Sequence, residues 1–252
     1  MKKSFYSLEG GAFPRGVRMA LVTDLHAQKY GKVLSALREL APDYILLGGD
    51  ILEALDGSRD DTNDAAFGFL SGAAKIAPTF YSVGNHEDGG VHSERSSWKK
   101  KHSRGMKRSY TEENLKRIKD SGVELLIDRY VIRGGIAFGG LASGLILEDH
   151  VPNLDFLETF SRLSEPKVLL CHHPEYYEPY VKKLPIELTL SGHAHGGQWR
   201  FFGRGVYAPG QGLFPKYTSG MHEGRFIISK GLKRTVIPPR IFNPTEIVII
   251  DT

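Results

Sequence analysis

The sequence predicts an α/β fold in which a parallel or mostly parallel sheet is covered by helices. The first half alternates short apolar runs of strand length with stretches that have helical spacing. The 252 residues are 40% hydrophobic and 25% charged, a composition that supports a buried core and excludes a disordered chain. Five of the apolar runs end in Asp, Asn or His, which is typical of a site at the ends of strands.

The expected elements of the first half follow the order β-α-β-α-β. Strands are expected at residues 17–23, 44–47 and 78–83, and helices at 32–40 and 61–75. This alternation is what places neighbouring strands in parallel.

The second half has a different pattern. Ser109 and Glu112 predict a capping box that opens a helix running to about Asp120. Three short apolar runs then suggest a meander, and a helix and four strands are expected after it. These elements are expected at residues 124–127, 130–133, 136–139, 154–163 (the helix), 167–171, 186–190, 225–229 and 246–250.

We expect one domain over residues 1–252, with a basic inserted loop at about 88–108. Residues 95–108 carry seven Lys and Arg and no acid, so the net charge of +4 comes from one local patch. This argues against a nucleic-acid-binding protein. Three interpretations of the patch stay open: a solvated loop, which is favoured, steering of anionic substrates, and contact with acidic lipid headgroups.

The low cysteine content and the lack of a long apolar segment exclude several classes of protein. Cys171 is the single cysteine, which excludes a disulfide framework and a cysteine-rich zinc module, and a core position is expected for it. Residues 136–147 are too short to span a bilayer, and no apolar stretch follows the two N-terminal lysines. A cytoplasmic protein is therefore expected, with peripheral membrane contact left open.

Metal-binding side chains follow five separate strand candidates. They are Asp24 and His26, Asp50, Asn85, His172, and His193 and His195. In extended chain, alternate side chains share a face, so each i, i+2 pair can serve one centre. Seven ligands are too many for one ion, and two ions are the usual arrangement for in-line displacement at phosphorus. Oxygen and nitrogen donors without thiolate favour Mn, Fe, Zn or Ni.

These blocks resemble the calcineurin-like metallophosphoesterase superfamily. The matching blocks are Asp24-x-His26, Gly49-Asp50, Gly84-Asn85-His86-Glu87, His172 and Gly192-His193-x-His195. The segments Gly-His-Ala-His-Gly-Gly-Gln and Arg240-Ile-Phe-Asn-Pro-Thr-Glu are similar to the bacterial YkuE/YaeI-like phosphodiesterase branch. The resemblance implies a two-sheet β-sandwich flanked by helices in α-β-β-α layers.

The resemblance also implies roles for single residues. Asp24, His26 and His195 match the ligands of a first metal, Asn85, His172 and His193 match those of a second, and Asp50 matches the bridge. His86 matches a histidine that contacts the phosphate and protonates the leaving oxygen, so His86 and Asp50 are the expected catalytic residues. His173 follows the ligand His172, and either substrate contact or a capped or surface position is open for it.

The implied function is a dinuclear metal-dependent phosphoesterase that prefers phosphodiesters and uses a metal-activated hydroxide. Manganese is the metal expected to support activity, and the substrate is a small or lipid-linked phosphoester with no protein partner. A protein phosphatase is a rival, although Ile51-Leu52-Glu53-Ala54 replaces the usual Asp-Arg-Gly segment. A UDP-diacylglucosamine-type pyrophosphatase and a non-catalytic metal-binding scaffold also stay open.

The remaining conspicuous side chains receive plainer interpretations. Glu87 is expected to hold the turn in which it lies. For the aromatic residues Trp98, Trp199, Phe201 and Phe202, packing or loop anchoring is favoured over lining a substrate cleft. Solvated positions are expected for His92, His102, His150 and His222.

Overall fold

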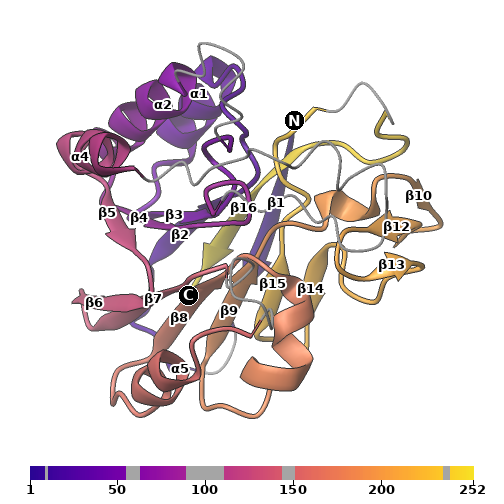
Figure 1. Ribbon diagram of the computed structural model, residues 1–252. Helices are drawn as coiled ribbons and strands as arrows, with labels where there is room; N and C mark the ends of the chain where they lie inside the picture. Colours follow the sequence, from indigo (N-terminus) through magenta and orange to yellow (C-terminus); the bar gives the residue numbers. More distant parts are fainter. Residues whose placement is uncertain (9–10, 55–62, 89–110, 144–150, 235–238) are drawn as a thin grey trace.

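Two six-stranded sheets pack face to face, and helices cover their outer faces (Figure 1). The computed structural model describes residues 1–8, 11–54, 63–88, 111–143, 151–234 and 239–252. The basic segment expected at 88–108 lies outside the described residues apart from Asp88.

The first sheet joins strands from both ends of the chain. In spatial order its strands are β1 (Lys2–Ser7), β16 (Glu246–Asp251), β2 (Arg18–Val22), β3 (Tyr44–Gly48), β4 (Thr79–Ser82) and β5 (Glu124–Leu126). Only β16 and β2 pair in antiparallel fashion, and the other neighbours are parallel. The predicted β-α-β-α-β order of the first half is therefore confirmed.

The second sheet is built from the second half of the chain. In spatial order its strands are β14 (Gly220–His222), β15 (Phe226–Ile228), β9 (Leu188–Ser191), β8 (Lys167–Cys171), β7 (Ile136–Leu141) and β6 (Arg129–Arg133). Its central strands β15, β9, β8 and β7 are parallel to one another. Two short hairpins stand apart from both sheets: β10 (Arg200–Phe201) with β11 (Arg204–Gly205), and β12 (Tyr207–Ala208) with β13 (Gly212–Leu213).

The helices complete the α-β-β-α layers. The first sheet is covered by α1 (Gly31–Leu40), α2 (Asp64–Ala74) and α4 (Glu112–Asp120). The second sheet is covered by α5 (Leu154–Ser161), the short 3-10 helix η1 (Pro174–Tyr176) and the π-helix η2 (Tyr177–Val181). The two-sheet sandwich implied by the sequence resemblance is confirmed. None of the helices in the described residues is long and apolar enough to cross a bilayer.

Strand alternation fills the core on both faces of each sheet. In β2, Ala20 and Val22 face the helices, whereas Met19 and Leu21 point into the space between the sheets. Because both faces of these central strands are covered, their sequences are continuously apolar rather than alternating. The sandwich interior is therefore closed by apolar side chains, which leaves the strand ends as the place for polar chemistry.

Two local expectations are wrong, and one strand is missed. β5 pairs with β4 in the first sheet while β6 and β7 belong to the second, so residues 124–139 form no meander. Asp128 turns the chain from one sheet to the other with a φ of 48°. The helix expected after Ser109 is capped by Thr111, whose hydroxyl accepts a hydrogen bond from the Asn114 N–H. The apolar pattern also does not predict strand β1.

The sandwich interior gives a test of stability. The rings of Phe80 and Phe138 stack across the two sheets with centroids 4.5 Å apart, and both are fully buried. We expect Phe138→Ala to lower the free energy of unfolding by about 3–5 kcal/mol, because it leaves a cavity between the sheets. Phe5→Ala, at a position that is 57% exposed, is the matched control for urea unfolding. Equal losses in the two variants would contradict this packing.

Candidate metal centre

The strand ends that carry polar residues meet at one place between the sheets. Gly49 follows β3 with a φ of 93°, and a Cβ there would lie 2.5 Å from the His172 ring that follows β8. A Cβ on Gly192, after β9, would lie 2.7 Å from the carboxylate of Asp24, which follows β2. These glycines allow the loops of the two sheets to approach each other.

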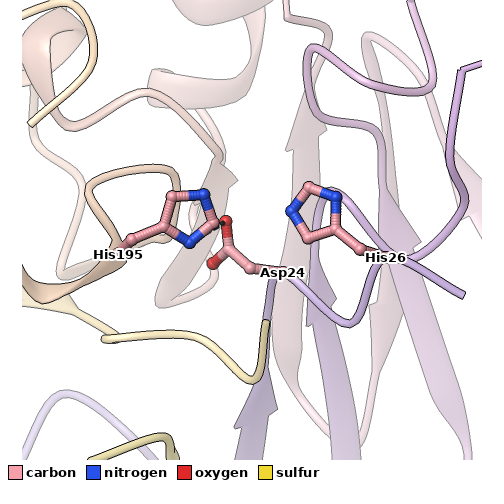
Figure 2. Close-up of side chains that lie close together, drawn as sticks. All are labelled: Asp24, His26 and His195. Atoms are coloured by element: carbon pink, nitrogen blue, oxygen red, sulfur yellow. Dashed lines mark ion pairs between the residues drawn. The ribbon is translucent and has the colours of Figure 1, made fainter. Parts of the chain in front are cut away.

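The first group of side chains is Asp24, His26 and His195. One potential ligand atom from each lies within 4.8 Å of the others. The Asp24 carboxylate lies between the two imidazole rings, with its Oδ1 3.8 Å from His195 Nδ1 (Figure 2). This is the set that the sequence resemblance assigned to a first metal.

The second group is Asp50, His172 and His193, whose potential ligand atoms also lie within 4.8 Å of one another. Asp50 Oδ2 is 3.3 Å from His172 Nε2 and 3.6 Å from His26 Nε2. Asp50 is thus next to a member of each group, which is where a bridging carboxylate has to lie.

Unusual backbone geometry accompanies these side chains. Five of the seven predicted ligands adopt the left-handed region, which residues other than glycine rarely enter. They are Asp24 (φ 54°), His26 (52°), Asp50 (53°), His193 (63°) and His195 (46°). Each lies just beyond the end of a strand, and this conformation turns the chain sharply so that the side chain points into the centre.

Buried polar atoms in the centre have no hydrogen-bond partner. Within the described residues these atoms include Asp24 Oδ2, His26 Nε2 and His172 Nε2. Leaving such atoms unsatisfied in the interior is costly unless something binds them. A carboxylate oxygen and imidazole nitrogens facing one space are the donors of a divalent cation, so the side chains present fit metal ions.

The surroundings shift the pKa values of His195 and His172 in opposite directions. Burial lowers the pKa of His195 to about 3, so its imidazole is neutral at physiological pH and can act as a ligand. Burial alone would lower the pKa of His172, but the adjacent Asp50 carboxylate outweighs it and raises this pKa to about 10. A cation bound at His172 therefore has to displace a proton.

Hydrogen bonds on the far side of the rings orient the ligand atoms. His172 Nδ1 lies 2.7 Å from the Gly48 carbonyl oxygen, and His26 Nδ1 lies 2.8 Å from Glu53 Oε1. Donation from Nδ1 leaves the lone pair of each Nε2 directed into the centre.

Glu53 is a residue that sequence reasoning missed. Its second oxygen lies 2.6 Å from His86 Nδ1, so one carboxylate holds both His26 and His86. Burial opposes ionisation, but the hydrogen bonds from the two histidines outweigh it and hold the pKa of Glu53 well below its usual range. The only sequence signal is its position three residues after Asp50 at the same strand end.

His86 and Asn85 are placed by the same loop. Both follow β4, and the His86 backbone N–H donates to Asp50 Oδ1 over 2.9 Å. Asn85 is buried, and a Cβ on the preceding Gly84 would collide with Asp50 Oδ1 and lie 2.8 Å from the His172 ring. Burial opposes a charge on His86, but the Asp50 and Glu53 carboxylates outweigh it and raise the pKa of His86.

His173 lies behind the second group rather than at its open side. The ring is 1% exposed, with Nε2 2.7 Å from Ser143 Oγ and Nδ1 3.2 Å from Glu175 Oε1. Its centroid is 4.4 Å from that of His193. Direct contact with substrate, one of the two alternatives left open by the sequence, would require one of these hydrogen bonds to break.

The C-terminal segment completes the surroundings of His195. Asn243 Nδ2 donates to the His195 carbonyl oxygen over 2.7 Å, and the Arg240 guanidinium lies 3.5 Å from His195 Nδ1. Both residues belong to the tail motif noted in the sequence. Their place in the centre was not predicted, because they lie more than 40 positions from His195.

Glu87 is structural, as expected. It is buried, and its carboxylate accepts hydrogen bonds from the backbone N–H groups of Asp50, Ile51, Leu52 and Gly84 and from the Tyr81 hydroxyl. Burial, with the Asp50 charge nearby, raises the pKa of Glu87 to about 7. The carboxylate ties the loop after β3 to the loop after β4.

Two further expectations are settled by burial and contacts. Cys171 is buried in the core under η1 and η2, and burial raises the pKa of its thiol. Trp199 anchors its loop, since the indole N–H donates to the Pro239 carbonyl oxygen over 3.0 Å.

Comparison with known proteins points to one family. A family model described as calcineurin-like phosphoesterase matches residues 17–197. The chain is 25% identical to the metallophosphoesterase Cj0846 of Campylobacter jejuni, over 94% of this chain and 59% of that protein. It is 26% identical to the metallophosphoesterase YkuE of Bacillus subtilis (93% and 78%) and 28% identical to the phosphodiesterase YaeI of Escherichia coli (73% and 62%). The chain spans about three fifths of the length of Cj0846 and YaeI.

The carboxylate of Glu87 gives a test of the centre. Glu87→Gln places an amide N–H group against backbone donors, so we expect the free energy of unfolding to fall by about 1–3 kcal/mol. Glu113→Gln, on the exposed face of α4, is the matched control in urea unfolding. A Glu87→Gln protein as stable as the control would show that these hydrogen bonds do not hold the two loops.

Proposed function

This chain belongs to the calcineurin-like phosphoesterase family, and we propose that it hydrolyses phosphate esters, phosphodiesters in preference, with two divalent cations. The observation that carries the proposal is the pair of His/Asp groups with Asp50 between them. Two cations held by a shared carboxylate form the usual clamp for in-line displacement at phosphorus. The phosphodiesterase name of the relative YaeI supports the preference for diesters.

Seven side chains would hold the cations. Asp24, His26 and His195 would hold one, Asn85, His172 and His193 the other, and Asp50 would contact both. When bound, the cations supply positive charge that stabilises the phosphoryl oxygens and lowers the pKa of water. Manganese suits this mixture of carboxylate, carboxamide and imidazole donors, and we propose it as the metal that supports activity.

His86 would act as the general acid. Its pKa is raised by the Asp50 and Glu53 carboxylates, which favours the protonated imidazole that a leaving alkoxide needs. Glu53 holds Nδ1, which leaves Nε2 directed towards Asp50 at 3.9 Å and towards the centre. Protonation of the leaving oxygen by Nε2 would complete the cleavage of the ester bond.

The charge of Asp50 tests the metal centre. Bis-p-nitrophenyl phosphate is the substrate, with manganese added to protein freed of other metals. We expect Asp50→Asn to reduce the amount of bound metal and to lower turnover. The loss of turnover should exceed roughly 10–100-fold, which is the usual cost of removing a residue that only supports a metal ligand. Asp155→Asn, exposed on α5, is the matched control. A wild-type protein that binds metal and turns over no diester or monoester would instead be a metal-binding scaffold.

Removal of the His86 imidazole tests the acid role. We expect His86→Ala to lower kcat by roughly 10²–10⁴-fold while both metals stay bound. The loss should be larger for diphenyl phosphate than for bis-p-nitrophenyl phosphate, because nitrophenolate leaves without a proton. The control is His222→Ala, since His222 lies on β14 at the edge of the second sheet, where its Nε2 is 3.2 Å from the Ser219 carbonyl oxygen. Equal losses on both substrates would contradict general-acid catalysis.

A further inference from the structure

Exposed apolar side chains gather beside the metal centre. They lie on the β10–β11 hairpin, at the end of the β12–β13 hairpin and in the C-terminal segment (Figure 1). We call this set the aromatic rim: Phe201, Phe202, Leu213, Phe214, Ile241 and Phe242.

The exposure of the rim is extreme for apolar residues. Phe202 is fully exposed, and Phe214, Phe242 and Leu213 are 79%, 78% and 70% exposed. In the described part of the chain these are the four most exposed large apolar side chains. The packing or anchoring role that the sequence favoured for Phe202 is therefore wrong. A cluster of this kind marks a surface that binds something.

The rim is attached to the metal centre by its own backbone. Trp199 pairs with Ile241 in a β-bridge, and the Arg200 N–H donates to the Ile241 carbonyl oxygen over 3.0 Å. The Arg200 side chain donates to the Gly196 carbonyl oxygen over 2.7 Å, next to His195. Whatever the rim binds is therefore held beside the first group of metal-binding side chains.

The second hairpin is fixed to the first. The Val206 N–H donates to the carbonyl oxygens of Gly197 and Trp199, and the Phe214 N–H donates to the Val206 carbonyl oxygen. The rings of Phe201 and Phe242 are 6.0 Å apart. The rim is thus one surface rather than a scatter of exposed side chains.

Every charged side chain in the segment that forms the two hairpins is basic, whereas Glu178 of η2 lies beside the β12–β13 hairpin. Residues 188–222 contain no Asp or Glu, and their basic residues are Arg200, Arg204 and Lys216. Arg204 is exposed and pairs across the hairpin with Phe201. Lys216 follows Phe214 by two positions and forms an ion pair with Glu178. The tip of the first hairpin therefore combines two phenylalanines with an exposed arginine.

We propose that the aromatic rim docks on the surface of an anionic lipid bilayer. Phenylalanine and leucine tips enter the boundary between headgroups and acyl chains, and Arg204 meets the lipid phosphates. The hairpins project away from the sandwich (Figure 1), and projecting apolar tips suit a deformable apolar phase better than a flat protein surface. Docking holds the metal centre at the depth of the headgroups. Docking at a bilayer implies that the substrate is a phosphoester of an amphiphile, and this implication rests on the proposed function. The docking itself does not depend on that function.

Vesicle sedimentation tests the docking without using turnover. The full chain is mixed with vesicles of phosphatidylglycerol and phosphatidylcholine, or of phosphatidylcholine alone, in buffer of physiological ionic strength. We expect the wild-type protein to sediment with the anionic vesicles, and Phe202→Ser/Phe214→Ser to lower the partition coefficient by about tenfold or more. Arg204→Gln should weaken binding to anionic vesicles and leave binding to neutral ones unchanged.

The matched control is Phe5→Ser/Ile132→Ser, which removes two exposed apolar side chains elsewhere, 57% and 44% exposed. It should bind vesicles as the wild type does, and thermal unfolding verifies that each variant is folded. Wild-type protein that stays in the supernatant, or equal losses in the rim and control variants, would overturn the proposal. So would a wild-type dimer that ignores vesicles and becomes monomeric in the rim variant, since the rim would then bind a second copy.

Discussion

The buried carboxylate of Glu87 is the interaction on which the metal centre depends. It receives four backbone N–H groups from the loops after the neighbouring strands β3 and β4, and the hydroxyl of Tyr81 within β4. Asp50 and His86 belong to those same loops, and the His86 backbone N–H donates to Asp50 Oδ1. A charge-assisted network of this kind is rigid because each bond would be costly to leave unmade inside the protein. Asp50 and His86, the side chains that we propose as catalytic, are thereby fixed before any ligand arrives.

Asp50 and Glu53 both follow β3 but contact different groups of side chains. Asp50 lies between the two groups of metal-binding side chains, whereas Glu53 holds the far nitrogens of His26 and His86. One loop therefore couples the position of a proposed metal ligand to that of the proposed acid. The left-handed backbone at Asp50 makes this possible, because it lets residues three apart face the same space.

The region after His195 links this centre to the surface. Gly196 and Arg200 connect the His195 turn to the β10–β11 hairpin, and Asn243 connects it to the C-terminal segment. Both connections lead directly to exposed phenylalanines. The proposed metal site thus lies on the sandwich, and the exposed apolar surface projects from its margin. The proposed catalytic and docking sites therefore occupy separate parts of connected loops.

The sequence by itself determined the layer order and singled out the seven side chains that we propose as metal ligands. Continuous apolar runs specify buried strands, and polar residues directly after them are forced to the strand ends, as Asp24, Asp50 and His193 show. Only the tertiary structure decided the pairings of Glu53 and Arg240 with histidines and the exposure of Phe202. These depend on how irregular loops approach one another, and no local periodicity encodes that approach. The same reason explains the missed β1, whose strand is defined by pairing with β16 at the other end of the chain.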